Sequence, residues 1–457
     1  MSPGRLERKR SLTVGNGGTE FTRVPGKRPV VGHLLRLRRD PLGFLESLPA
    51  YGDLARVRLG PWRAFVACHP DVAHEVLTDF RRFDRTGPVY DKVRQAMGAG
   101  LATAGYHDHR RQRLVMQPAF RHEHLSGYVE VMRKQVTAAT ADWQDGQELD
   151  LTEAMFELTT GVALTALFSS RLGGQETREL RSALDVFLGG LTSRAALPGI
   201  GRLPTPGNRR YARALDHWQT QVRRLIEGYS ELGTGQDDLM SRLLAARDEE
   251  GHALSYQELS DQVAVLLLAG GETTSSAVVW AVHLLSGRPD VLAAVRAEVD
   301  AVLGGRAAGA ADLPQLGLTG RVVKETLRLY PPGWLTLRTA THDTTLGGHR
   351  LEAGSMVLIS PYLLHRREDF YHDAARFEPD RWLASPPATR GSYLPFGAGA
   401  TKCIGEEFGE AEATVILASL LGRWELTPIG GPVTCSARLV LSPASFRVWV
   451  SARSTTS

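Results

Sequence analysis

Cysteine is scarce in this sequence, and its first residues contain no long hydrophobic run. The three cysteines, Cys68, Cys403 and Cys435, are widely separated and odd in number among 457 residues. This usage excludes a disulfide framework and indicates a reducing compartment, so we expect a cytoplasmic protein. Because the chain begins with basic and glycine-rich segments, we expect neither a signal peptide nor a membrane span there.

A large excess of charge of either sign is also absent. The formal net charge is +4, which argues against nucleic acid as a partner. Residues 1–24 are basic, and we expect a disordered tail; a membrane or nucleic-acid contact is the alternative, although short basic runs are usually just solvated. Residues 25–457 are expected to form a single domain with a β-rich N-terminal part and a helical body, although length alone would allow about three domains.

What the sequence does contain is a cysteine flanked by glycines, in the segment FGAGATKCIG at residues 396–405. Glycines on both sides predict a tight loop, because glycine reaches positive φ at little cost. Residues 406–421 follow with helical spacing, so Cys403 is expected at a helix N-terminus, whose amides favour a thiolate. An isolated cysteine is usually a small buried hydrophobe, but this spacing favours a metal ligand.

The spacing Phe-x-x-Gly followed by Cys-x-Gly resembles the haem-binding loop of the cytochrome P-450 family. The resemblance implies a mainly α fold with small β-sheets, in which haem b lies between a long central helix and the cysteine loop. It makes Cys403 the axial thiolate of the iron, which favours O–O cleavage, and places Phe396 beside the cofactor. The family usually has Arg or His two residues before the cysteine, whereas this chain has Thr401.

A long central helix is predicted between the capping box at residues 255–258 and the stop formed by Gly287 and Pro289. Its middle carries AGGETT at residues 269–274, where each interior glycine costs about 1 kcal/mol relative to alanine. Close approach of a flat cofactor and dioxygen would offset that cost, and a simple helix kink is the alternative. The hexapeptide matches the family's oxygen-binding motif, which implies that Gly270 contacts the cofactor, that Thr273 hydrogen-bonds to dioxygen and that Glu272 delivers protons.

Two further motifs resemble those of the family. Glu325 and Arg328 are spaced i, i+3 on one helix face, and Arg381 follows in the segment FEPDRW. By resemblance these three form a buried structural network that fixes the haem loop, whereas an isolated pair would be a surface ion pair of little weight. His109 and Arg113 share another helix face. With Arg338 they are expected to bind the haem propionates; a solvated basic face is the alternative.

The substrate pocket is harder to place from the sequence. Residues 83–104 show no sustained periodicity, and the resemblance implies a mobile loop over the pocket; an ordinary surface connection is the alternative. We expect six residues to face the substrate, although core packing would explain them equally well: Phe187, Leu268, Trp334, Leu335, Leu337 and Ala444.

Residues 39–45, 47–54 and 203–211 resemble actinobacterial sesquiterpene oxidases of the pentalenene oxygenase kind. This implies a cyclic terpene as the substrate, with a macrolide, polyketide or fatty acid as the alternative. Apolar pocket residues favour a hydrophobic small molecule, since unpaired buried charge is costly. Such terpene oxidation belongs to secondary metabolism.

The resemblance as a whole implies a monomeric, soluble haem-thiolate monooxygenase that uses O2. Because no flavin or iron–sulfur segment is present, electrons are expected from a ferredoxin and its reductase, docking near Arg110, Arg111 and Lys402. A peroxygenase or isomerase of the same fold would be expected to lack the Glu272–Thr273 pair. A non-catalytic haem protein is the alternative from another class.

Overall fold

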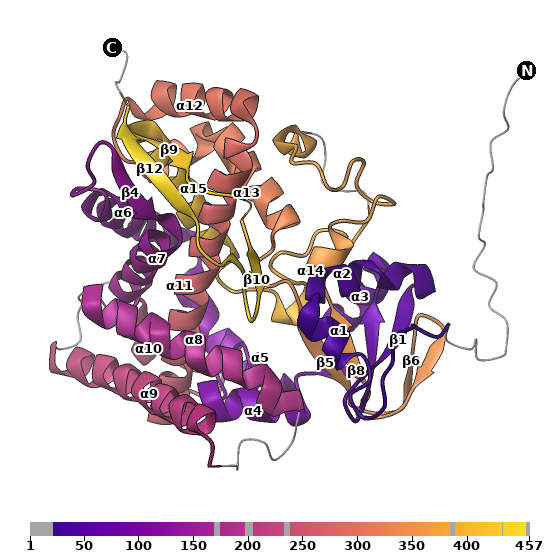
Figure 1. The fold of residues 1–457 in the computed structure, drawn as a ribbon. Helices are drawn as coiled ribbons and strands as arrows, with labels where there is room; N and C mark the ends of the chain where they lie inside the picture. Colours follow the sequence, from indigo (N-terminus) through magenta and orange to yellow (C-terminus); the bar gives the residue numbers. More distant parts are fainter. Residues whose placement is uncertain are drawn as a thin grey trace, which may run out of the picture.

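The computed structural model describes residues 22–168, 174–196, 204–232, 238–383, 389–431 and 433–453. Most of the tail expected at residues 1–24 lies outside these ranges. Long helices build the body of the molecule, and small sheets lie at its edges (Figure 1). The helices are α1 Leu34–Arg39, α2 Pro41–Glu46, α3 Pro70–Thr78, α4 Pro88–Met97, α5 Tyr106–Met116, α6 His122–Ala139, α7 Leu151–Phe168, α8 Gly174–Ala196, α9 Pro206–Leu232, α10 Leu239–Ala245, α11 Tyr256–Ser286, α12 Pro289–Leu303, α13 Gly317–Leu329, α14 Pro361–Leu364 and α15 Glu406–Arg423.

Helix α11 runs through the centre of the body, as its sequence predicts (Figure 1). Ser255 accepts a hydrogen bond from the Glu258 amide, and the Glu258 carboxylate accepts one from the Ser255 amide, which satisfies two amide donors at the start of the helix. By length and composition α7 and α11 could each cross a membrane, but 67% and 72% of their apolar windows are buried inside the protein. Their apolar character therefore serves the core.

Within the described ranges, the strands form four small sheets. The largest has the order β1-β2-β8-β5-β3, and its antiparallel pair β1–β2 belongs to the N-terminal part expected to be rich in β structure. Within it β2 pairs with β8 in parallel, and the other pairs are antiparallel. The strands are β1 Leu54–Leu59, β2 Trp62–Ala67, β3 Phe83–Asp84, β4 Gln147–Asp150, β5 Thr336–Ala340, β6 Thr344–Leu346, β7 His349–Leu351, β8 Met356–Ile359, β9 Trp424–Pro428, β10 Cys435–Ala437, β11 Leu441–Pro443 and β12 Arg447–Ala452.

Residues 83–104 are more regular than expected. They contain strand β3 and helix α4, which begins after Gly87 at φ +90° with Pro88 in its first turn. The helix is only ten residues long and mixes apolar residues with four charged or amide side chains, so its period was not recognised in the sequence. The remaining stretch, residues 98–104, turns back toward α11.

The largest apolar cluster lies between α6, α7, α11, α13 and α15. A second cluster, built from α5, α7, α9, α10 and α11, packs against the N-terminal half of α11, whereas the first packs against its C-terminal half. The central helix is therefore fixed by packing along its length, which gives its residues well-defined positions.

Candidate functional site

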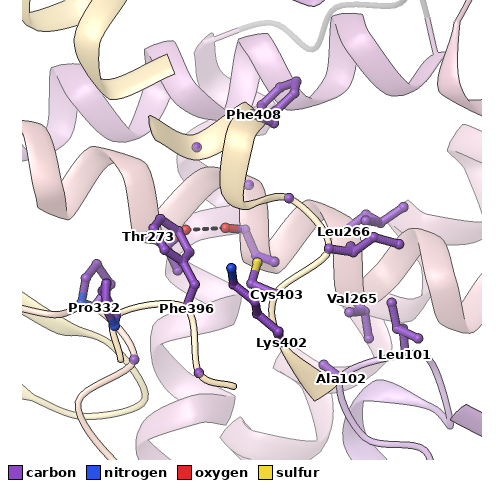
Figure 2. A pocket seen from close by; sticks show the side chains of 18 of the residues that line it. Leu101, Ala102, Val265, Leu266, Thr273, Pro332, Phe396, Lys402, Cys403 and Phe408 are labelled. Atoms are coloured by element: carbon purple, nitrogen blue, oxygen red, sulfur yellow. Dashed lines mark hydrogen bonds between the residues drawn. The ribbon is translucent and has the colours of Figure 1, made fainter. Parts of the chain in front are cut away.

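A cavity of about 400 Å³ lies where α11, α15, β5 and the cysteine loop meet. Figure 2 shows Cys403 near the middle of the view, with Leu101, Ala102, Val265 and Leu266 together on one side. The wall is mostly apolar, and four basic side chains gather at one edge. This arrangement suits a small apolar guest beside one reactive centre.

The loop before Cys403 is held in a fixed turn. The Cys403 amide donates a hydrogen bond to the Phe396 carbonyl at 2.8 Å. Gly397 and Gly399 have φ of +72° and +66°, and a Cβ on Gly399 would lie 2.5 Å from the Leu77 carbonyl oxygen of α3. Helix α15 starts three residues after the cysteine, so the predicted loop and helix N-terminus are confirmed.

Protein atoms surround the Cys403 sulfur closely, although its side chain remains accessible from the cavity. Burial raises the pKa of the thiol; the Gly405 amide, Arg113 and Lys402 lower this pKa, and Glu406 raises it. The Gly405 amide thus favours the thiolate, as expected, but burial outweighs it and the pKa of the free thiol is raised. A coordinated metal ion deprotonates a thiol regardless, so ligation would set the charge of this sulfur.

A buried ion pair lies behind the loop. On α13, Arg328 Nε and Nη2 donate to the Glu325 carboxylate at 2.9 and 2.8 Å, and both side chains are fully buried. Arg381 Nε lies 3.4 Å from the same carboxylate, and Trp382 Nε1 donates to it at 2.9 Å. The structure thus brings together the three residues that the sequence assigned to one network.

His365, which the sequence analysis missed, connects this network to the cysteine loop. Its Nδ1 donates to the Arg328 carbonyl at 3.0 Å, and its Nε2 accepts from the Leu394 amide at 2.7 Å. Burial lowers the pKa of His365 to about 3, so the ring is neutral and carries one donor and one acceptor. Leu394 lies just before Phe396, so the start of the loop is attached to the buried ion pair.

Basic side chains gather at one edge of the cavity: His109, Arg113 and Arg338, as the sequence predicts, together with Arg85. Arg338 Nη2 donates to Thr401 Oγ1 at 2.8 Å. The unusual residue at position 401 is therefore a hydrogen-bond partner of an arginine. Arg85 is almost completely buried, and no spacing in the sequence linked it to the other three.

The electrostatics of this edge favour an anion. Burial, with Arg85, Arg113 and Arg338, lowers the pKa of His109 to about 3, so this ring is a neutral donor here. Burial and nearby Arg338 lower the pKa of Arg85 to about 10, which leaves it charged at neutral pH. The guanidinium groups repel one another, so a bound carboxylate would relieve that repulsion.

These features fit haem b. One thiol faces the cavity, aromatic Phe396 and Phe408 line it, and the cationic edge suits two carboxylates of a flat macrocycle. Among the described residues no group of three or more His, Cys, Asp or Glu side chains could hold a metal ion without help. A single protein ligand, Cys403, is the donor set expected where the macrocycle supplies the other ligands.

The α11 wall carries the predicted threonine. Thr273 lines the cavity, and its hydroxyl donates to the Ala269 carbonyl one turn earlier, which leaves the hydroxyl oxygen as an acceptor. Glu272 is half-buried and lies outside the cavity lining. The two residues are adjacent in the chain but present different surfaces of α11.

The glycine pair of α11 has a second cause that the sequence could not reveal. A Cβ on Gly270 would lie 3.0 Å from Ala163 Cβ, and one on Gly271 would lie 2.8 Å from Thr160 Oγ1. Both neighbours belong to α7. Gly270 lines the cavity as expected, but tight packing of α7 against α11 also requires these glycines.

Glu412 of α15 is a third residue that the sequence analysis missed, after His365 and Arg85. Its side chain lines the cavity and is fully buried. Neither carboxylate oxygen has a hydrogen-bond partner within normal geometry. The Thr274 hydroxyl is nevertheless close enough to favour the charged form of the carboxyl group. Burial raises its pKa to about 8. It is therefore largely protonated at neutral pH.

Most of the expected pocket residues face elsewhere. Thr336 and Arg338 line the cavity from β5, so the alternation of a strand turns Leu335 and Leu337 away. The structure also places Leu268, Trp334 and Ala444 outside the lining. Leu268 packs in the core behind α11, and Trp334 donates to the Arg438 carbonyl in another cluster. The side chain of Phe187 lies outside the described residues.

Comparisons with known proteins agree with this geometry. Residues 23–449 match the family model for cytochrome P450. The chain is 45% identical over 416 residues to cyclooctatin synthase of Streptomyces melanosporofaciens, covering 90% of this chain and 91% of that protein. It is 42% identical over 413 residues to cyclooctat-9-en-7-ol 5-monooxygenase of the same species (89% and 90%) and 41% identical over 407 residues to pentalenene oxygenase of Streptomyces avermitilis (88% and 91%).

Proposed function

The chain belongs to the cytochrome P450 family, and from that premise we propose that it oxidises a cyclic terpene at a C–H bond. The observation that carries the proposal is the Cys403 thiol facing an apolar cavity opposite the threonine-bearing wall of α11. When bound, haem activates O2 so that one oxygen atom enters the substrate and the other leaves as water.

Residues of this chain are assigned to binding the haem iron and the haem carboxylates. Cys403 holds the iron, and Arg85, Arg113 and Arg338 bind the haem carboxylates, with His109 as a neutral donor. The hydrogen bond from the Cys403 amide to the Phe396 carbonyl fixes the direction of the thiol.

Proton supply is assigned to α11. The Thr273 hydroxyl is positioned to accept a hydrogen bond in the cavity, since its own proton is donated to the Ala269 carbonyl. Glu272, to which we assign proton delivery, lies on the adjacent, half-buried surface of the helix. Replacing Thr273 by alanine should therefore divert electrons from product to reduced oxygen species.

The cavity supports a hydrocarbon substrate. Its wall above the cysteine is built from Leu101, Val265, Leu266 and Ala269, which would leave a charged guest without partners. Relatives at 41–42% identity carry the names pentalenene oxygenase and cyclooctat-9-en-7-ol 5-monooxygenase, so their named substrates are cyclic terpenes. A macrolide, a polyketide or a fatty acid is the second candidate class.

The test begins with the reduced protein under carbon monoxide, which should show the red-shifted absorbance of a thiolate-ligated haem. Pentalenene, cyclooctat-9-en-7-ol, a long-chain fatty acid and a macrolide are then titrated while the haem spin state is followed. We expect a shift with a terpene. Absence of the carbon monoxide band would contradict the haem-thiolate site, and a shift with the fatty acid or macrolide alone would overturn the terpene assignment.

Electrons are proposed to enter beside the cysteine. A second hollow reaches Cys403 itself, and its lining includes Arg113, Arg121, His122 and Lys402 together with the acidic Glu406 and Glu407. Lys402 pairs with Glu406 and His122 with Glu407, so the remaining positive charge of the rim comes from Arg113 and Arg121. A ferredoxin with an acidic surface would dock at these arginines, with its reductase supplying electrons in turn. Arg111, which we expected in the docking patch, instead pairs with Asp248 and Glu258 and serves the fold.

We further propose that the protein acts as a cytoplasmic monomer. Ferredoxin-dependent turnover, measured as NADPH-dependent product formation with a surrogate ferredoxin and reductase, separates the enzyme from a haem-based ligand carrier. Formation of product would contradict the hypothesis of a non-catalytic carrier. If the terpene binds but no product forms in the presence of ferredoxin, reductase and NADPH, the carrier hypothesis is favoured.

A further inference from the structure

We propose that Asp261 and Gln262 are positioning residues that hold residues 98–104 as a fixed wall of the cavity, and that this wall selects the substrate. The inference rests on the proposed function, because it concerns the same cavity. Residues 98–104 belong to the expected mobile loop and contribute Leu101 and Ala102 to the cavity wall, while Arg85 of the same loop lines the cationic edge.

Two adjacent side chains of α11 bind the backbone of this segment. Asp261 Oδ2 accepts from the Ala99 amide at 2.7 Å, and Gln262 Oε1 accepts from the Leu101 amide at 2.9 Å. Asp261 is 9% exposed and Gln262 is fully buried, so water does not compete well for these bonds. Breaking one would leave a buried donor without a partner.

The carbonyls of the same segment are also occupied by side chains. Gln112 of α5 donates to the Ala99 carbonyl at 2.8 Å, and Arg85 donates to the Leu101 carbonyl at 2.7 Å. Thr103 donates to the Gly98 carbonyl at 2.7 Å. The segment is thus fixed through amides and carbonyls alike.

Glycines let the segment lie directly on α11. A Cβ on Gly98 would be 2.1 Å from Asp261 Oδ1, and Gly98 has a φ of +78°. A Cβ on Gly100 would be 2.6 Å from the Asp261 carbonyl oxygen and 2.9 Å from Val265 Cγ2. These contacts are independent of the hydrogen bonds, and they show that a larger side chain would lift the segment away from the helix.

The consequence for the cavity is a preformed surface. Leu101 is anchored through its own amide and carbonyl, and it lies beside Ala102 and Val265 in Figure 2. A wall that is already ordered costs little further entropy when a rigid hydrocarbon binds. It also holds that hydrocarbon in one orientation toward the reacting centre, which favours oxidation at one carbon. Arg85 connects this wall with the cationic edge of the cavity.

Hydrogen exchange tests the anchoring in the haem-loaded protein. Gln262→Leu removes the acceptor of the Leu101 amide, and Asp261→Ala removes that of the Ala99 amide. Each variant should raise amide exchange in residues 98–104 by about tenfold, as expected for loss of one buried hydrogen bond. The matched control is Gln257→Leu on the same helix, which removes a bond to the other oxygen of Asp261 and leaves both anchors in place. Unchanged exchange in both test variants would overturn the anchoring.

Ligand binding separates positioning from general destabilisation. Imidazole reaches iron without filling the cavity, whereas 4-phenylimidazole also needs an apolar wall. We expect Gln262→Leu and Asp261→Ala to weaken the binding of 4-phenylimidazole by about fivefold, because the wall is no longer preorganised. The binding of imidazole should weaken by less than about twofold. Equal weakening of both ligands, or of neither, would contradict the inference. A normal carbon monoxide band in the variants keeps this failure distinct from failure of the haem-thiolate site, which would remove the band from the wild type as well.

Discussion

The two sides of the cavity are held by different kinds of polar contact. Behind the cysteine loop, a fully buried ion pair between Glu325 and Arg328 sits within one helix turn. Across the cavity, Asp261 and Gln262 bind backbone amides of a segment roughly 160 residues away in the chain. The cysteine side depends on two buried charges that must stay paired. The substrate side depends on hydrogen bonds from backbone amides to side chains, and each of these bonds can be removed by one substitution.

This difference indicates a division of labour. A broken buried pair leaves an uncompensated charge, so the cysteine side should tolerate almost no change. A lost amide bond costs about 1–3 kcal/mol, so the substrate side can be altered while the fold survives. We infer that substitutions rarely move the cysteine without unfolding the protein, whereas substitutions in the cavity wall can change the substrate specificity of a folded protein.

The largest expected effect is loss of the ion pair. Arg328→Ala leaves the buried Glu325 carboxylate without its partner and should cost about 3–5 kcal/mol of unfolding free energy. Denaturant unfolding measures this cost. The exposed pair Arg63–Glu352 provides the control, and Arg63→Ala should cost less than about 1 kcal/mol. Similar losses in both variants would show that burial does not distinguish the two pairs.

The next effect depends on pH and concerns Glu412. Because burial raises its pKa to about 8, the folded protein binds one more proton than the unfolded chain between about pH 4.5 and 8. This group therefore makes stability fall as pH rises through that window, by at most about 1.4 kcal/mol per pH unit. Glu412→Gln removes the titration, so its stability relative to the wild type should increase from pH 5 to pH 8. Thermal midpoints across this range, showing a constant difference, would contradict the buried-carboxyl assignment.

A smaller effect is expected where the ion pair meets the loop. His365→Leu removes both the bond to the Arg328 carbonyl and the bond from the Leu394 amide, while it keeps the site apolar. The cysteine loop should loosen, and transfer of haem to apomyoglobin should become about tenfold faster. The exposed His372→Leu serves as the control. If both variants release haem at the wild-type rate, His365 does not hold the loop.

The smallest effect is predicted at Thr401. Thr401→Ala removes an acceptor from Arg338, but Arg85, Arg113, His109 and Arg338 itself remain at the edge. We expect haem transfer to change by less than about threefold, since the loss is one partly solvated hydrogen bond. Rapid haem loss from the intact wild-type protein would instead show that these residues do not replace the usual charge at position 401.

The cysteine side of the cavity could be predicted from local patterns in the sequence. The glycine-flanked Cys403 loop, the helix that follows it and the i, i+3 spacing of Glu325 and Arg328 are short-range features that need no knowledge of the fold. The capping box of α11 is another. The pocket residues were harder to predict from the sequence, because apolar residues such as Leu268 and Trp334 suit a cavity wall and a core equally well.

The sequence by itself determined the family, the glycine-flanked loop of Cys403, the central helix with its Thr273 and the residues of the buried network. The tertiary structure decided which side of β5 faces the cavity, placed Arg85 and Glu412 in its wall, and joined His365 to the loop. It also turned residues 98–104 from an expected mobile loop into a segment anchored on α11. The physical reason is distance along the chain: these contacts join segments whose proximity arises only when the helices and sheets have packed, so no spacing within one segment can encode them.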